Sequence, residues 1–109
     1  MNFRIPTNRR PSHPGHILLK EFLEPMGITQ KELADGIKTP YQRVNDLVHG
    51  RRSVTPATAV RLAKFFDTSP DMWMNLQMRC DLYDATRDEG QVLKTIKTWH
   101  APPQQASAN

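Results

Sequence analysis

An all-helical fold is predicted for this chain of 109 residues, and two observations predict it. Apolar residues recur at spacings of three and four, as on one face of an α-helix. Five segments also begin with a helix start signal, either a capping side chain or a proline at the first helical position. Strand-like alternation is absent before residue 90. We therefore expect one small domain of five helices with a short C-terminal extension.

The expected organisation has four parts. Residues 1–13 read as a basic N-terminal arm, because they contain prolines and arginines without an apolar period. Residues 14–88 carry the five helices, and residues 89–100 form the C-terminal extension. The sequence of 90–100 fits either a short helix or a short strand, and the choice stays open. Residues 101–109 offer nothing to bury and read as a disordered tail.

Helix starts and stops are well specified. The first helix is expected from Pro14 to Glu24, ended by Pro25 and Gly27. The fourth is expected from Thr55-Pro56 to Phe66. The fifth starts at Ser69-Pro70 and carries an apolar stripe that consists of Trp73, Leu76, Cys80 and Tyr83.

The second and third helices are short and close together. Thr29 and Glu32 form a predicted capping box at the start of the second helix, which reaches Ile37. The third begins at Thr39, with Pro40 at the first helical position, Gln42 completing a second capping box and Gly50 as the stop. A connection of only a few residues forces the two helices to cross steeply, as in a helix-turn-helix.

A helical rotation of 100° per residue divides the third helix into two faces. Tyr41, Val44, Leu47 and Val48 fall on the inward side. The outward side holds Gln42, Asn45, Asp46 and His49, with Arg43 on the flank. Arg can donate twice to guanine, and Asn or Gln can pair twice with adenine in the major groove. This face therefore has the groups that read base edges, although exposed polar residues are common on any helix.

The flanks of this helix suit phosphate binding. Gln30 and Lys31 lie in the first turn of the second helix, where free N–H groups favour an anion. Arg51, Arg52 and Ser53 follow the third helix directly, and an ordinary exposed loop is the alternative reading. Residues 1–52 carry nine Lys and Arg against five Asp and Glu, whereas residues 53–109 carry six of each. That asymmetry fits either one polyanion-binding face or a solvated basic surface.

Several other classes are disfavoured. The apolar runs are too short to cross a membrane, and the N-terminus lacks the pattern of a secretory signal, so a cytoplasmic location is expected. Cys80 is the sole cysteine and cannot form an intramolecular disulfide. His13 and His16 are three apart but have no third ligand at a fixed spacing. We expect no catalytic set, metal, cofactor or small-molecule substrate, and an enzyme is the weakest of the functional hypotheses.

The segment QKELADGIKTPYQRVNDLVHGRR resembles the helix-turn-helix of the Xre/Cro-like repressors. With HPGHILLKEFLEPMGITQ before it and SVTPATAVRLAKFFDTSPDMWMNLQMRCDL after it, the chain resembles the HigA-type antitoxins over about residues 13–85. The resemblance implies a five-helix, lambda-repressor-like domain. It further implies a homodimer that represses its own operon at a palindromic double-stranded DNA operator and neutralises a HigB-like toxin, an mRNA endonuclease.

Site residues follow from the resemblance together with the spacing above. The expected base contacts are Tyr41, Gln42, Arg43 and Asn45. The expected phosphate contacts are Gln30, Lys31, Thr39, Arg51, Arg52 and Ser53. Three positions depart from the family pattern, since Lys38 and Asp67 stand where glycine is usual and His16 replaces the usual glutamate. Lys38 either avoids a positive φ or bears strain.

Two further hypotheses keep the fold and change the function. One is a stand-alone Xre-type regulator without a toxin, and the other is a toxin-binding module that binds DNA weakly. Trp73, Tyr83 and Trp99 are candidate dimer contacts, because a domain this small buries limited apolar area. Core packing alone would also explain the stripe that contains Trp73 and Tyr83.

Overall fold

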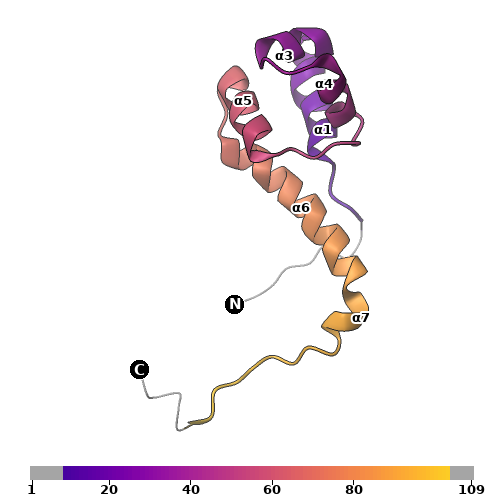
Figure 1. Ribbon diagram of the computed structural model, residues 1–109, viewed down its shortest axis with the longest axis vertical. Helices are drawn as coiled ribbons and strands as arrows, with labels where there is room; N and C mark the ends of the chain where they lie inside the picture. The colour runs from indigo at the N-terminus through magenta and orange to yellow at the C-terminus, as the bar shows by residue number, and fades with distance from the viewer. Residues whose placement is uncertain (1–8, 104–109) are drawn as a thin grey trace.

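The computed structural model describes residues 9–103, and it is helical with no strand in that range. The elements in chain order are α1 (Pro14–Ile17), the π-helix η1 (Leu18–Leu23), α2 (Glu24–Met26), α3 (Gln30–Gly36), α4 (Tyr41–Val48), α5 (Pro56–Phe66), α6 (Pro70–Asp88) and α7 (Gly90–Leu93). The predicted all-helical class is confirmed. Figure 1 shows α1, α3, α4 and α5 gathered at one end, with α6 running away from them towards α7. None of the described helices is long and apolar enough to span a membrane.

The first predicted helix is one continuous helix made of α1, η1 and α2, and it runs past Pro25 to Met26. The prediction that Pro25 helps to end it is therefore wrong, whereas Gly27 does end it with φ 67°. Proline cannot donate the usual helical hydrogen bond to the residue four before it. The wider π turns precede Pro25, and the N–H of Glu24 already donates five residues back, to Leu19. The helix has thus changed its bonding pattern before the proline is reached.

Side-chain caps start most of the remaining helices. Thr29 accepts from the N–H of Glu32 over 3.0 Å, and the Glu32 carboxylate accepts from the N–H of Thr29 over 2.9 Å, which confirms the first capping box. Thr55 caps α5 and Ser69 caps α6, as expected. These hydrogen bonds satisfy N–H groups that the first helical turn leaves open.

The second capping box is not formed. Pro40, with extended backbone angles, is the N-cap of α4, and it has no side-chain group to accept a hydrogen bond. Thr39 lies one residue too early, and its hydroxyl donates to the carbonyl oxygen of Ile37 over 3.3 Å. Gln42 bonds within α4 instead. The prediction misplaced the helix start by one residue, since it put Pro40 at the first helical position and α4 begins at Tyr41.

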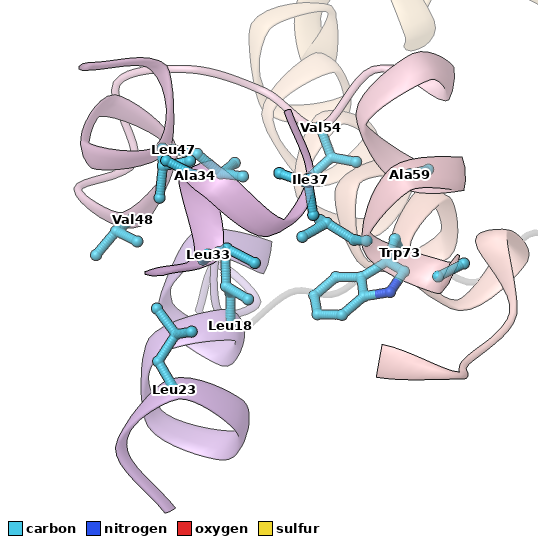
Figure 2. Close-up of a cluster of buried hydrophobic side chains, with 13 residues drawn as sticks. Leu18, Leu23, Leu33, Ala34, Ile37, Leu47, Val48, Val54, Ala59 and Trp73 are labelled. Atoms are coloured by element: carbon cyan, nitrogen blue, oxygen red, sulfur yellow. The ribbon is translucent and has the colours of Figure 1, made fainter. Parts of the chain in front are cut away.

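The core lies between the first helix, α3, α4, α5 and the start of α6. Figure 2 shows Leu18 and Leu23, Leu33, Leu47 and Trp73 pointing into this interior from different helices. Trp73 is 0% exposed, and its ring lies 5.0 Å from that of Phe22 between centroids. Its Nε1 donates to the hydroxyl of Thr68 over 2.9 Å. Trp73 therefore belongs to the protomer core, and the prediction that it contacts a second chain is wrong because it has no exposed surface.

Residues before α1 are fixed along α6. Arg10 forms two hydrogen bonds of 2.9 Å with the carboxylate of Asp84, and the thiol of Cys80 lies 3.4 Å and 3.3 Å from the carbonyl oxygens of Pro11 and Ser12. Within the expected basic arm, residues 1–8 lie outside the described part of the chain. The remainder of the arm is anchored to α6 by the pairing of Arg10 with Asp84.

The C-terminal extension begins with the short helix α7, and residues 96–102 after it have no regular structure. The open choice for residues 90–100 is thereby decided in favour of a helix at its start. Four apolar side chains of the extension are exposed, and they are Val92, Leu93, Ile96 and Trp99. Residues 104–109 of the expected disordered tail lie outside the described residues. Tyr83, on α6, is buried, and its hydroxyl accepts from Arg87 over 3.2 Å.

Candidate nucleic-acid interface

The two helices α3 and α4 form a compact helix-turn-helix. Ala34 on α3 and Val44 and Leu47 on α4 are buried at their contact, and the small alanine side chain allows close approach. The predicted inward face of α4 is thus confirmed for Val44, Leu47 and Val48. Tyr41 was also expected to face inward, but it is 50% exposed. It is the first residue of α4, so no preceding helical turn covers it.

The outward face of α4 is accessible as predicted. Gln42, Arg43 and His49 are exposed, whereas Asn45 and Asp46 are half-buried. The difference follows from hydrogen bonding between side chains, which covers part of Asn45 and Asp46. Three polar or aromatic side chains are therefore exposed on the first turn of α4, and they are Tyr41, Gln42 and Arg43.

Hydrogen bonds connect side chains on this face with side chains beside it. The amide of Asn45 donates to Gln30 at the start of α3 over 2.9 Å and accepts from Arg51 over 3.0 Å. Arg51 also donates to the carboxylate of Asp46 over 3.2 Å, and Gln42 donates to the same carboxylate over 2.9 Å. These bonds, first that from Gln42 and then that from Arg51, lower the pKa of Asp46. The network connects expected base contacts to expected phosphate contacts.

The end of α4 positions the cationic residues. Gly50 has φ 74°, the N–H of Gly50 donates to the carbonyl of Leu47, and the N–H of Arg51 donates to the carbonyl of Asp46 over 2.8 Å. This pair of bonds is a Schellman motif, which favours glycine at the left-handed position and confirms the predicted stop. It turns the chain so that Arg51 reaches back along α4. Arg52 and Ser53 are exposed beside it.

At the other end of the motif, Gln30 is half-buried and Lys31 is exposed in the first turn of α3. Lys31 pairs with Asp35 over 3.3 Å, but both side chains are more than two-thirds exposed, so the pair contributes little. Thr39 is half-buried in the turn, and Lys38 before it has φ 57°. The question left open by the sequence is answered, because Lys38 does adopt the left-handed conformation that glycine usually takes.

Sequence reasoning missed two functional neighbours of this surface. Asp46 was placed on the outward face without a role, although its spacing of four from Gln42 is the signal for a helical side-chain pair. Arg61, on α5, was not considered for the site. It donates to the backbone of the turn that joins α3 to α4, and nothing in its local sequence indicates that contact.

Comparison with known proteins places this surface in a family. A family model described as Helix-turn-helix matches residues 19–73. Antitoxin HigA-1 of Vibrio cholerae is 37% identical over 91 residues, which cover 84% of this chain and 86% of that protein. This chain is a HigA-type member of the helix-turn-helix family.

Two further relatives fit the helix-turn-helix family. The uncharacterized HTH-type transcriptional regulator YbaQ of Escherichia coli K12 is 43% identical over 76 residues, covering 70% of this chain and 67% of that protein. The Pseudomonas aeruginosa protein PA4674, solved in complex with its operator DNA, is 40% identical with a TM-score of 0.80. That alignment covers 84% of this chain and 98% of the solved chain.

Two other features of this HigA-type chain bear on its chemistry, namely possible metal ligands and its cysteine. Between residues 9 and 103 no three His, Cys, Asp or Glu side chains lie together as metal ligands would. Cys80 is buried, and burial raises the pKa of its thiol. The HigA-type helix-turn-helix family is a class of DNA-binding regulators and antitoxins, not of enzymes, and the exposed face of α4 is the surface that fits this class.

Proposed function

We propose that this chain is a cytoplasmic, non-catalytic antitoxin that acts as a homodimer, represses its own operon at a palindromic operator and neutralises a HigB-like toxin. One observation carries the proposal. The exposed first turn of α4 presents Tyr41, Gln42 and Arg43, while Arg51 and Arg52 stand at the other end of the same helix. A short helix that offers amide and guanidinium groups between cationic flanks matches the shape and chemistry of a major groove.

Base reading and phosphate binding fall to different residues in this proposal. Gln42 and Arg43 reach base edges, and Tyr41 contacts the groove wall or a base beside them. Arg52, Lys31 and the N-terminus of α3 contact phosphates, which sets the register of the protein on the duplex. Asn45, Gln30 and Arg51 act mainly by holding the shape of the surface, since their side chains are already bonded to one another. Thr39 and Ser53 remain candidate phosphate contacts.

Recognition of a palindrome requires two copies of the chain. Met78 and Leu82 on α6 are 50% and 43% exposed, and Trp99 in the extension is 75% exposed. An open hollow of about 460 Å³ beside α6 has an apolar lining of Val54, Met74, Met78, Leu82 and Ala85, and Ser53, Asn75, Gln77 and Asp81 also border it. We propose that a second copy of this chain covers this apolar surface, with Trp99 as an anchor. Tyr83 is buried and contributes little exposed area to the contact.

Two names among the relatives support different versions of the function. The likeness to Antitoxin HigA-1 supports toxin neutralisation, and the operator complex of PA4674 supports DNA binding. The likeness to the regulator YbaQ favours a second candidate, a stand-alone Xre-type regulator. Co-expression with the protein encoded by the neighbouring reading frame separates the two. An antitoxin restores the growth that a neighbouring toxin arrests, whereas a stand-alone regulator has no such toxin beside it.

A gel-shift titration of the duplex upstream of the chain's own gene tests the DNA-binding half. We expect a dimer to bind two half-sites whose centres lie about 34 Å apart, or a multiple of that. Binding should weaken steeply as salt is raised, because phosphate contacts release counterions. Equal affinity for this duplex and a scrambled one, or no binding to either, would contradict the proposal.

A further inference from the structure

Arg61 joins α5 to the turn between α3 and α4. Its Nη1 donates to the carbonyl oxygens of Ile37 over 3.0 Å and of Lys38 over 2.7 Å, and it lies 3.5 Å from the hydroxyl of Thr39. Carbonyl groups at the end of a helix have no helical N–H partner. A guanidinium is charged at every accessible pH, and its hydrogen bonds are stronger than those between neutral groups. Arg61 therefore satisfies the end of α3 from a helix outside the motif.

The turn that Arg61 binds is strained. Lys38 has φ 57°, a conformation in which a Cβ atom crowds the backbone and which glycine adopts without that cost. A chain with lysine at this position needs a compensating interaction to keep the turn in one conformation. The hydrogen bond from Arg61 to the carbonyl of Lys38 is the shortest of the three contacts, and it is made at the strained residue itself.

A second contact of α5 supports the same turn. Phe65 lies one helical turn after Arg61, and its ring lies against Gly36, the last residue of α3. A Cβ atom at Gly36 would clash with Cε1 of Phe65, so any other residue there would require the ring to move. Residues 61 and 65 thus fix the end of α3 together, one through its carbonyl groups and one through packing.

We propose that Arg61 is a positioning residue for the DNA-binding helix α4. By holding the left-handed turn at Lys38, it fixes the angle at which α4 leaves α3 and so presents Gln42 and Arg43 to the groove. The inference rests on the proposed function, because the angle of α4 matters for operator binding. Arg61 acts through the turn, and no contact between Arg61 and DNA is required.

Arg61→Met tests this role by keeping most of the apolar stem and removing the donors. When the turn is formed in only a fraction of molecules, the apparent affinity falls by that fraction, and we expect operator binding to weaken about 5- to 30-fold. Lys38→Gly relieves the strain, so the double variant Arg61→Met with Lys38→Gly should bind within about threefold of Lys38→Gly alone. Lys64→Met is the matched control, since it removes one cation from the exposed side of the same helix.

Amide hydrogen exchange in the absence of DNA gives the second readout. The N–H of Thr39 donates to the carbonyl of Ala34 over 2.9 Å across the turn. We compare the exchange rate of the Thr39 amide with that of core amides of α6 in the same protein. This rate should increase in Arg61→Met and fall back to the wild-type value in the double variant. Unchanged exchange at Thr39 in Arg61→Met, or no rescue by Lys38→Gly, would overturn the proposal. If the wild-type chain binds no operator, the proposed function fails while this exchange experiment still decides the role of Arg61.

Discussion

Asn45 joins the two helices of the DNA-binding motif to each other, because its Nδ2 donates to Oε1 of Gln30 over 2.9 Å. Its Oδ1 is also engaged, by Nη2 of Arg51 over 3.0 Å. An amide has two N–H donors and two acceptor lone pairs, so these two bonds use half of its capacity and fix its orientation. We propose that Asn45 contributes to recognition by fixing the start of α3 and the end of α4 against each other.

A double-mutant cycle on Gln30 and Asn45 tests this relationship. Gln30→Ala and Asn45→Ala should each weaken operator binding, and the double variant should bind about as well as the weaker single variant. The expected coupling is about 0.5 to 3 kcal/mol, the range for residues that share a network. Four titrations of the operator duplex measure it. Independent contacts of the two residues with DNA would instead give additive losses.

Asp46 places a negative charge within the surface that we propose to meet DNA. Asp46→Asn removes this charge and weakens the hydrogen bonds that Gln42 and Arg51 donate to it. We expect affinity for scrambled DNA to rise about fivefold at low salt, because the surface then repels phosphates less. The gain should shrink as salt is raised.

The matched control for that experiment is Asp71→Asn, which makes the same change in the first turn of α6. A gel-shift series with scrambled duplex at two salt concentrations compares the variants. The account of Asp46 is wrong if both variants raise the affinity equally, or if Asp46→Asn lowers it.

His13 caps the start of α1, and we expect it to make folding depend on pH. Its Nδ1 accepts from the N–H of Gly15 over 2.9 Å. Gly15 lies against the carbonyl oxygen of Leu47 in α4, where a Cβ atom would clash. Burial, and then the charge of Arg10, lower the pKa of His13 below its usual 6.5. The folded state therefore favours the neutral ring, which can accept the capping hydrogen bond.

The sign of the pH effect follows from that shift. The contribution of His13 to the free energy of unfolding is complete above pH 6.5 and decreases as the pH falls towards the lower pKa of the folded state. Urea unfolding between pH 8 and pH 5 measures it, with His13→Asn as the comparison, because asparagine caps a helix without titrating in this range. If the free energy of unfolding changes with pH equally in both proteins, His13 is not the source of the pH dependence.

Local signals made the helices predictable, whereas contacts between helices were not. The box of Thr29 and Glu32 and the stop at Gly50 each depend on a few neighbouring residues, and both were confirmed. The prediction for Pro25 is wrong because the residues next to it give no signal for the π turns that precede it. The hydrogen bond from Asn45 to Gln30 depends on the angle between two helices, and residue spacing alone does not specify that angle.

The same distinction explains the aromatic residues of α6 and the extension. An apolar stripe on a helix predicts burial but not whether the burial occurs within one chain or between two. Trp73 faces the core of its own chain and packs beside Phe22 and Phe66. Trp99 has no such cover from residues 9–103, and 75% of it is exposed.

The proposed dimer is tested by Trp99→Ala and by a chain that ends at Gly90. Loss of a buried aromatic anchor at an interface costs about 2 kcal/mol or more, so the dimer dissociation constant should rise at least about 30-fold. Sedimentation equilibrium of each protein measures it. Met26→Ala is a suitable control, because Met26 is also exposed but lies at the end of the first helix. An unchanged dimer in both variants would exclude the extension from the interface.

Arg43→Ala is the sharpest test of whether the exposed face of α4 reads the operator. The measurement is the ratio of affinities for the operator and for scrambled DNA, with Arg79→Ala on α6 as the control for loss of one exposed cation. We expect Arg43→Ala to lower the ratio by about 1 to 3 kcal/mol, roughly 5- to 150-fold, and Arg79→Ala to leave it within about twofold of the wild-type value. Equal effects of the two substitutions on the ratio would contradict the claim.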